Sequence, residues 1–208
     1  DRGLIGSTEN LICFSFDGIK NITSGEGGAV ITNDDELASH IRDARLLGVT
    51  GDTSRRISGH RTWFPDVHMQ GWRYHMSNIF AAIGLSQLAK SSSMFTKRKQ
   101  LVQNYLVMFA ESKMIQCLDL NHNTLVPHIF PIFVPPLLRD SLRALLLEDG
   151  IQTGLHYYPN HLLTKFRTNY SLPVSESAGL SLVSLPLHTK LTSHEQNYVI
   201  ERLLYHLD

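Results

Sequence analysis

Hydrophobic residues form two kinds of pattern along the chain: short apolar runs, and longer segments with helical spacing. Residues 11–16 and 29–32 are apolar runs of strand length beside polar or glycine-containing loops, so we predict that both are short buried strands. Apolar residues then recur every three to four positions after residues 33–35, whose side chains can cap a helix. This pattern predicts a helix over residues 34–47, with Gly48 as its stop.

The next helical pattern follows Ser77, whose hydroxyl can cap a helix N-terminus. Its apolar face is broad and consists of Ile79, Ala82, Ile83, Ser86 and Leu88. Small residues at positions 81, 82 and 84 permit close helix packing, and helical spacing resumes over residues 97–112. We interpret these helices as a connection between two domains.

The last part of the chain alternates between strand-like and helix-like patterns. Residues 114–120 and 127–134 are predicted as strands around a polar turn at residues 121–123. Residues 138–148 form an amphipathic pattern that ends at Asp149-Gly150, and residues 151–158 are predicted as a third strand. The order strand, strand, helix, strand indicates a small α+β domain. Thr192 and Glu195 have the spacing of a capping box and open the last predicted helix.

Composition limits the classes of protein that the chain can represent. Hydrophobic residues make up 42% and charged residues 18%, which is typical of a globular protein with one or two cores. Lys plus Arg and Asp plus Glu are 19 each, so no basic field favours nucleic acid. No apolar run has the length of a membrane span and no signal peptide is visible, so we expect a cytoplasmic protein without membrane contact.

Histidines and cysteines suggest no metal site or disulfide framework. The 11 histidines are scattered without metal-ligand spacing. Cys13 and Cys117 lie in apolar runs far apart, and we predict that both are reduced thiols in a core. The chain begins with Asp1 instead of methionine, so we expect a fragment or a processed product.

The most informative loop lies between the first two predicted strands and contains Lys20. Gly25, Gly27 and Gly28 follow it, and glycines allow positive φ and close approach of the backbone to a neighbour. A lysine amine at the edge of a core can lose its solvation and attack a carbonyl group. A solvated loop lysine is the alternative.

A second irregular segment covers residues 49–70. Arg55, Arg56 and Arg61 alternate there with His60, Trp63 and Phe64. Basic residues interleaved with aromatic ones can bind a phosphate or a nucleobase by charge and stacking. A polar surface loop with one packed tryptophan is the alternative.

The loop pattern resembles a known family. Ser15-Phe16, three residues, Lys20, then Gly25-Glu26-Gly27-Gly28 and a hydrophobic strand is similar to the cofactor-lysine segment of the DegT/DnrJ/StrS family of sugar-nucleotide aminotransferases. Residues 71–77, Gly-Trp-Arg-Tyr-His-Met-Ser, and residues 156–161, His-Tyr-Tyr-Pro-Asn-His, match later blocks of this family in the same order. The C-terminal pattern also matches, so the resemblance covers essentially the whole chain.

The resemblance implies an α/β fold like that of aspartate aminotransferase, which binds pyridoxal 5'-phosphate (PLP). Residues 1–90 would be the C-terminal part of an incomplete large α/β domain. Residues 91–113 would form a connecting helix, and residues 114–208 a small α+β C-terminal domain.

The resemblance also implies roles for individual residues. Lys20 would be the catalytic lysine that binds PLP covalently, and Ser15 would contact the cofactor phosphate. His75 stands where the family commonly has an Asn or Arg that reaches the cofactor phosphate of the partner subunit. The substrate-binding residues would be Tyr74, His156, Tyr157 and His161.

Each assignment has a structural alternative. The Ser15 hydroxyl could hydrogen-bond locally, and His75 could be a buried histidine that the backbone satisfies. His156 and Tyr158 could alternate on the face of a strand and only pack.

The implied reaction moves an amino group, usually from glutamate, to a keto group of a nucleotide-linked deoxyhexose for polysaccharide or lipopolysaccharide synthesis. The family acts as a homodimer with shared active sites. In the family an aspartate, an aromatic residue and a Gly-Thr pair precede the lysine, and this chain lacks them. The chain alone is therefore not expected to bind PLP as a whole enzyme would. A sugar dehydratase on the same fold and a catalytically silent subunit are alternatives; the intact Lys20 favours transamination.

Overall fold

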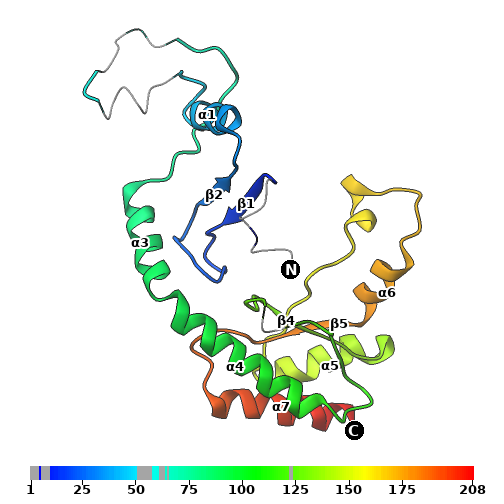
Figure 1. The fold of residues 1–208 in the computed structure, drawn as a ribbon. Coiled ribbons are helices and arrows are strands. Elements are labelled where there is room, and N and C mark those ends of the chain that lie inside the picture. Colours follow the sequence, from blue (N-terminus) through cyan, green and yellow to red (C-terminus); the bar gives the residue numbers. More distant parts are fainter. Residues whose placement is uncertain (1–4, 6–9, 51–57, 61–63, 65, 122–123) are drawn as a thin grey trace. The chain divides into compact units, whose positions relative to one another are not determined.

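The computed structural model describes residue 5 and residues 10–50, 58–60, 64, 66–121 and 124–208. The chain divides into two compact units, residues 1–91 and residues 92–208 (Figure 1). Arg55, Arg56, Arg61 and Trp63 of the basic-aromatic segment lie outside the described residues, as do positions 122 and 123 of the predicted turn.

Two short strands form the sheet of the first unit. β1 (Ile12–Ser15) pairs antiparallel with β2 (Gly28–Ile31), and Ser15 lies opposite Gly28. A side chain at Gly28 would meet the backbone of β1, because a Cβ there would lie 2.6 Å from the Phe14 carbonyl oxygen. Both predicted strands are confirmed, and the Lys20 loop connects them. The prediction that they are buried was wrong, because no residue of either strand is buried.

Side-chain caps start the two long helices of the first unit. Asp34 accepts a hydrogen bond from the Leu37 N–H at 2.9 Å and opens α1 (Asp35–Ala44). Ser77 accepts one from the Phe80 N–H at 3.2 Å and opens α3 (Asn78–Ala89). Both helices are confirmed. α1 ends three residues earlier than predicted, because Leu47 and Gly48 both adopt positive φ and the Gly48 N–H bonds to the Asp43 carbonyl.

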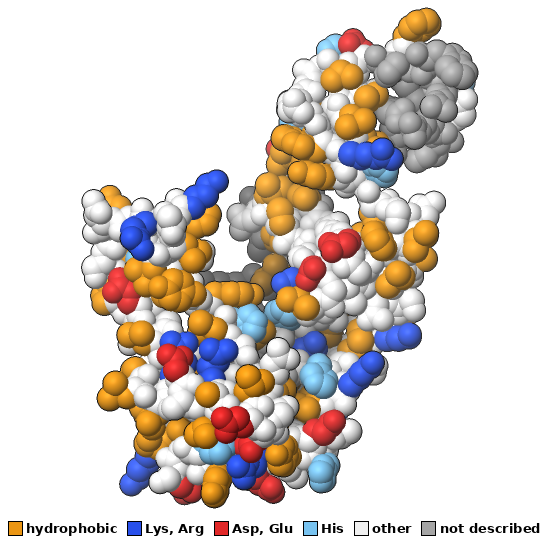
Figure 2. All heavy atoms as spheres, turned by 180° about the vertical axis from the view of Figure 1, so that it is seen from behind, with side chains coloured by type: hydrophobic (Ala, Val, Ile, Leu, Met, Phe, Trp, Pro, Cys, Tyr) orange, Lys and Arg blue, Asp and Glu red, His pale blue; other side chains and the backbone are white. Residues whose placement is uncertain are grey.

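Apolar side chains of the first unit remain accessible to solvent. Among its described residues only Ser24 and Gly48 are buried, and both β1 and β2 expose apolar side chains such as Phe14 and Val30. α3 contains no charged residue, yet none of its residues is buried. Figure 2 shows hydrophobic side chains (orange) at the molecular surface.

The second unit packs helices on an antiparallel sheet with the strand order β3-β4-β5. The strands are β3 (Gln116–Cys117), β4 (Phe130–Phe133) and β5 (Leu182–Leu185). The helices are α4 (Ser91–Phe109), whose first residue belongs to the first unit, α5 (Pro136–Glu148), α6 (Pro173–Ser181) and α7 (Ser193–Leu207). Two short 3-10 helices, η1 (Asn160–Leu162) and η2 (Thr164–Phe166), precede α6.

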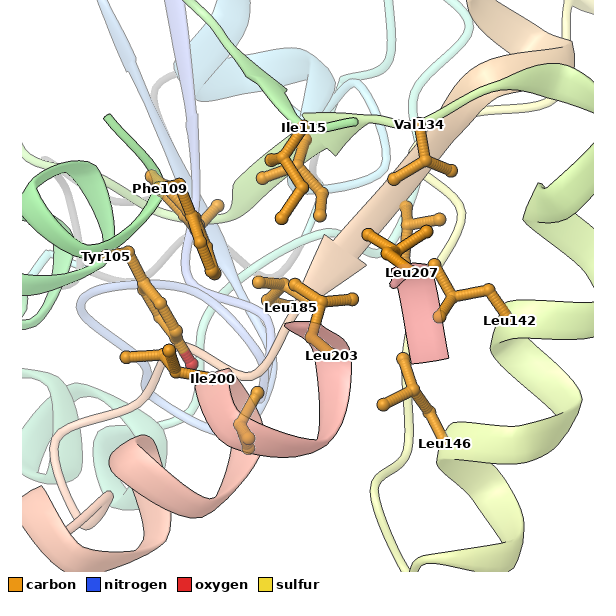
Figure 3. Close-up of a cluster of buried hydrophobic side chains, with 14 of the residues drawn as sticks. Tyr105, Phe109, Ile115, Val134, Leu142, Leu146, Leu185, Ile200, Leu203 and Leu207 are labelled. Atoms are coloured by element: carbon orange, nitrogen blue, oxygen red, sulfur yellow. The ribbon is translucent and has the colours of Figure 1, made fainter. Parts of the chain in front are cut away.

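One hydrophobic core holds this unit together (Figure 3). Tyr105 of α4 stacks on Phe130 of β4 with 4.8 Å between ring centroids, and its hydroxyl donates to the Pro186 carbonyl at 3.0 Å. Burial raises the pKa of Tyr105. Leu146 of α5 and Leu203 of α7 are fully buried in the same core.

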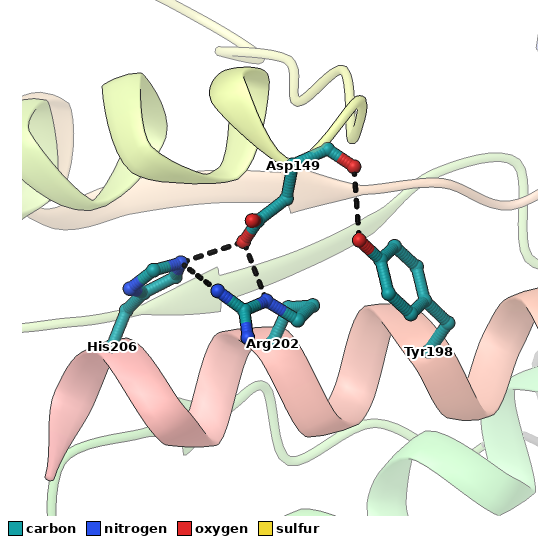
Figure 4. A network of polar contacts seen from close by, with 4 residues as sticks. All are labelled: Asp149, Tyr198, Arg202 and His206. Carbon is teal, nitrogen blue, oxygen red and sulfur yellow. Dashed lines mark hydrogen bonds and ion pairs between the residues drawn. The ribbon is translucent and has the colours of Figure 1, made fainter.

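Polar contacts fix both ends of α7. At its start Thr192 and Glu195 form the predicted capping box, which is confirmed. Towards its end the Asp149 carboxylate accepts a hydrogen bond from Arg202 Nε at 2.7 Å and lies 2.7 Å from His206 Nε2 (Figure 4). The Tyr198 hydroxyl donates to the Asp149 carbonyl at 3.2 Å. This network ties α7 to the end of α5.

The structure corrects two further predictions. Residues 151–158 do not form a strand; they contribute a single antiparallel bridge between Gly154 and Ser184, and the third strand of the sheet is β5. Cys13 is exposed on β1, so its assignment to a core was wrong. Cys117 is half-buried against the core, and burial raises the pKa of its thiol. Both thiols are free.

Two features are absent from the described residues. None of the helices in these parts of the chain combines the length and the apolar character that a membrane crossing requires. The same residues contain no group of three His, Cys, Asp or Glu side chains that could hold a metal ion.

Candidate active site

Lys20 lies on a tight turn directly after β1. Its N–H donates to the Asp17 carbonyl at 3.0 Å, and the Ile19 N–H donates to the Asp17 carboxylate at 3.3 Å. Asp17 also forms a bridge with Gly25, which closes the base of the loop. The Lys20 residue is half-buried. The turn therefore holds the lysine backbone in one place through short-range hydrogen bonds.

The far side of the Lys20 loop rests on α3 and the segment before it. Ser24 is fully buried; its N–H donates to the Phe16 carbonyl at 2.9 Å and its hydroxyl to the Glu26 carbonyl at 2.7 Å. Gly27 has φ +138°, and a Cβ there would overlap the end of the Met76 side chain. A Cβ on Gly84 of α3 would lie 3.4 Å from the Ser24 Cβ. Glycines at positions 27 and 84 let the loop pack closely against Met76 and α3.

Ser15, the last residue of β1, and Lys20 are both hydrogen-bonded to Asp17. The Ser15 hydroxyl accepts a hydrogen bond from the Asp17 N–H at 3.3 Å, which is the local contact expected as an alternative to a cofactor role. Asp17 thus bonds to Ser15 through its N–H and to Lys20 through its carbonyl. In general a primary amine can react with an aldehyde, and a hydroxyl can donate to a phosphate.

Tyr74 and His75 lie on the segment that leads into α3. The Tyr74 N–H donates to the Arg45 carbonyl at 2.9 Å, and the Tyr74 ring stacks on Trp72 with 6.0 Å between centroids. Tyr74 and Met76 line a hollow of about 730 Å³ together with residues of β1, β2 and α1. His75 is exposed, so it is not a buried histidine of the kind considered as an alternative.

His156 and Tyr157 lie in the second unit, beside β5. His156 Nδ1 lies 2.9 Å from the hydroxyl of Ser184, which is buried. The imidazole meets the Tyr157 ring edge-on, with 5.0 Å between centroids and 86° between planes. His156 is thus held by the protein itself, whereas Tyr157 is exposed.

His161 is buried and paired with a carboxylate. His161 Nε2 lies 3.0 Å from Glu176 Oε1, and the same oxygen accepts a hydrogen bond from the Leu172 N–H at 2.8 Å. The bond from Leu172, followed by the contact with His161, lowers the pKa of the Glu176 carboxyl. This arrangement connects η1, the segment before α6, and α6.

Within each unit the structure brings some of the predicted site residues together. In the first unit Ser15 and Lys20 are joined through Asp17, and Tyr74 lines a hollow with residues of β1 and β2, the strands that the Lys20 loop connects. In the second unit His161 and Tyr157 line one hollow, and His156 packs against Tyr157. Sequence reasoning missed Ser184 and Glu176. Ser184 could have been identified because it interrupts the apolar run 182–185, and a buried hydroxyl requires a hydrogen-bond partner.

Comparisons with known proteins locate the whole chain in one family. The profile of the DegT/DnrJ/EryC1/StrS aminotransferase family matches residues 2–204. The uncharacterized protein MJ1066 of Methanocaldococcus jannaschii is 30% identical over 203 residues, which are 93% of this chain and 52% of that protein. The chain thus spans about half the length of this curated relative.

Solved structures agree in fold over nearly the whole chain. The aminotransferase TlmJ from Streptoalloteichus hindustanus superposes with a TM-score of 0.86 at 26% identity, covering 95% of this chain and 52% of that one. The PLP form of the putative sugar aminotransferase Spr1654 from Streptococcus pneumoniae gives a TM-score of 0.83 at 28% identity, covering 97% and 52%. The predicted α/β fold of the aspartate-aminotransferase type is confirmed.

Proposed function

Since the chain belongs to the DegT/DnrJ/EryC1/StrS aminotransferase family, we propose that it carries the lysine-bearing part of a PLP-dependent sugar aminotransferase. The observation that supports this proposal is the turn that holds Lys20 and Ser15 at its two ends and rests on α3. The amine would bind the cofactor aldehyde, and the Ser15 hydroxyl would donate to its phosphate.

The proposed chemistry divides between the cofactor and the chain. Bound PLP supplies an electron sink for the carbon next to the transferred amino group. The Lys20 Nζ atom, once free, moves a proton to and from that carbon as general acid and base. The hydrogen bonds that Asp17 accepts from the Lys20 and Ile19 N–H groups would hold the Lys20 backbone in place while its amine acts. His75, which is exposed, would donate to the cofactor phosphate of a partner subunit.

The finer features of the function are also part of the proposal. The amino acceptor would be a keto group of a nucleotide-linked deoxyhexose, and the donor an amino acid, usually glutamate. Tyr74, His156, Tyr157 and His161 would form or support the substrate site. A cytoplasmic homodimer with shared active sites would supply sugars for polysaccharide or lipopolysaccharide synthesis. Residues 1–90, 91–113 and 114–208 would be the large-domain part, the connecting helix and the small domain.

Covalent trapping at Lys20 tests this proposal. In the protein that carries this chain, PLP is added, the product is reduced with borohydride, and the peptides are mapped. We expect a pyridoxyl group on Lys20, and the variant Lys20→Arg is expected to lose both the label and amino transfer. Lys113→Arg is the matched control, because Lys113 is an exposed lysine of the second unit, and it is expected to keep both.

The outcome separates the competing interpretations. A label on lysines other than Lys20, or no label at all, would contradict the proposal and favour a catalytically silent subunit. A label on Lys20 in a protein that dehydrates its sugar substrate without transferring nitrogen would favour the dehydratase.

A further inference from the structure

Ser24 is the only residue with a buried side chain among the described residues of the first unit. This side chain is polar, and a buried hydroxyl destabilises a fold unless it forms a hydrogen bond. The Ser24 hydroxyl meets this requirement by donating to the Glu26 carbonyl at 2.7 Å. Its N–H donates to the Phe16 carbonyl at 2.9 Å. Both donors of Ser24 are thus used within the Lys20 loop, and the residue offers no exposed group to a ligand.

Further hydrogen bonds close the base of the Lys20 loop around Phe16. The Phe16 N–H donates to the Gly27 carbonyl at 2.8 Å, and the Phe16 carbonyl accepts from the Thr23 hydroxyl at 3.2 Å. The same carbonyl accepts the bond from the Ser24 N–H. Phe16 directly follows Ser15 in the sequence. The part of the loop that returns to β2 is therefore bonded to the residue next to Ser15.

One face of α3 supports the returning part of the loop. A Cβ at Gly25 would lie 3.8 Å from the Phe80 ring, and a Cβ at Gly84 would lie 3.4 Å from the Ser24 Cβ. Phe80 and Gly84 are four residues apart on α3, so they share a face of the helix. Ser24 is thus enclosed between the loop and α3, which leaves it little room to move.

A chain of contacts connects Ser24 with Lys20 and Ser15. Gly25, the residue after Ser24, forms a bridge with Asp17. Asp17 accepts a hydrogen bond from the Lys20 N–H at 3.0 Å and donates through its own N–H to the Ser15 hydroxyl at 3.3 Å. Loss of the Ser24 hydrogen bond would therefore loosen the residue to which both Lys20 and Ser15 are bonded.

We infer that Ser24 is a positioning residue for amino transfer: its buried hydrogen bond keeps the backbone of Lys20 and of Ser15 at a fixed spacing. This inference rests on the proposed function, in which Lys20 binds the aldehyde of PLP and Ser15 its phosphate. These two groups of one PLP molecule are a set distance apart, so both contacts form together only where the spacing in the protein matches. A misplacement of about 1 Å in such an arrangement can lower a rate on the order of 100-fold.

The preference of Lys20 for PLP over pyridoxal, which lacks the phosphate, measures this spacing. In the protein that carries this chain, each aldehyde is added, the product is reduced with borohydride, and the labelled Lys20 peptide is quantified. We expect the unchanged protein to prefer PLP and Ser15→Ala to reduce that preference. Ser24→Ala is expected to reduce it by about five- to tenfold, the loss typical of one hydrogen bond. Labelling by pyridoxal, which needs the amine alone, is expected to stay nearly the same.

Two further variants sharpen the measurement. Thr32→Ala is the matched control, because the Thr32 hydroxyl also bonds to the backbone of the first unit, accepting from the Asp34 N–H at 3.1 Å beyond the end of β2. It is expected to keep the preference for PLP. Ser24→Cys keeps the size of the side chain but offers a weaker donor, so a smaller reduction than in Ser24→Ala is expected. Circular dichroism checks folding, and Ser24→Cys carries the test if Ser24→Ala does not fold.

Hydrogen exchange followed by mass spectrometry gives a second readout that needs no cofactor. Ser24→Ala is expected to speed amide exchange by about five- to tenfold in peptides from residues 16–27. Peptides from α1 are expected to exchange as they do in the unchanged protein. A general loss of stability would instead speed exchange in both segments.

Two results would overturn the inference. The first is that Ser24→Ala prefers PLP as strongly as Thr32→Ala does, or loses labelling by PLP and by pyridoxal to the same extent. The second is that exchange in residues 16–27 stays unchanged or rises equally in α1. Failure of the proposed function gives a different result, because the unchanged protein would then carry no label on Lys20, while hydrogen exchange would still report on the loop.

Discussion

The two units of this chain differ in how far they bury their own apolar side chains. The second unit closes a core from α4, α5, α7 and the β3-β4-β5 sheet, and Leu146 and Leu203 are fully buried in it. In the first unit no described hydrophobic residue is buried, although α3 is mostly apolar and contains no charged residue. A helix of that composition is typical of a protein interior. The described residues of the unit with Lys20 thus have local turn geometry but form no buried apolar core of their own.

The strongest test of this comparison separates the two units. A polypeptide of residues 92–208 is expected to unfold in one cooperative transition with a defined near-ultraviolet spectrum, because its core is complete. A polypeptide of residues 1–91 is expected to show no such transition. Urea titrations followed by circular dichroism measure both. A cooperative transition of residues 1–91 alone would show that the first unit also folds around a core of its own.

A core truncation tests the second unit at a single residue. Leu203→Ala is expected to lower the free energy of unfolding by about 2–5 kcal/mol, because it leaves a cavity at a site with 0% exposure. Leu137→Ala is the control: Leu137 is 95% exposed on α5, so a change within about 0.5 kcal/mol is expected. Equal losses in both variants would show that burial does not govern the stability of this unit.

The Asp149 network predicts a smaller effect that depends on pH. The hydrogen bond from Arg202, then that with His206, holds the pKa of the Asp149 carboxyl below its usual value. A carboxyl with a lowered pKa in the folded state stabilises the fold above its unfolded pKa, about pH 4, and this contribution is lost as the pH falls through the folded pKa. The stability difference between the unchanged chain and Asp149→Asn is therefore expected to shrink below about pH 4.

Urea titrations at several pH values measure that difference. Glu148→Gln, one residue earlier and exposed, is the control and is expected to change the unfolding free energy little at any pH. A difference for Asp149→Asn that stays constant with pH would show that the carboxylate makes no net contribution as a charge.

Local signals explain which elements could be predicted from the sequence. Asp34, Ser77 and Thr192 each start a helix through a bond to a backbone N–H three residues away. Such caps depend on neighbours in the chain alone and are therefore visible in the sequence. The hydrogen bonds that connect Ser15 with Lys20 are equally local. The residues of this segment also resemble the family's cofactor-lysine pattern, which is visible in the sequence alone.

Features that depend on distant neighbours could not be predicted in this way. The alternation over residues 151–158 resembles a strand, but only Gly154 pairs, and it does so with Ser184, 30 residues further on. The apolar run around Cys13 did not reveal that this residue is exposed to solvent. Glu176 lies 15 residues from His161, and no spacing rule links the two.

The β1–β2 pair also leads us to expect aggregation of the chain at high concentration. Among the described residues each strand has only one neighbour, so each has a free edge of backbone N–H and C=O groups. Phe14 and Val30 place exposed apolar side chains beside these edges. Free edges with apolar flanks are templates for pairing between copies, which leads to aggregation. We therefore expect aggregation to limit the purification of this chain, and we expect a lysine introduced on either strand to improve its yield without changing the Lys20 turn.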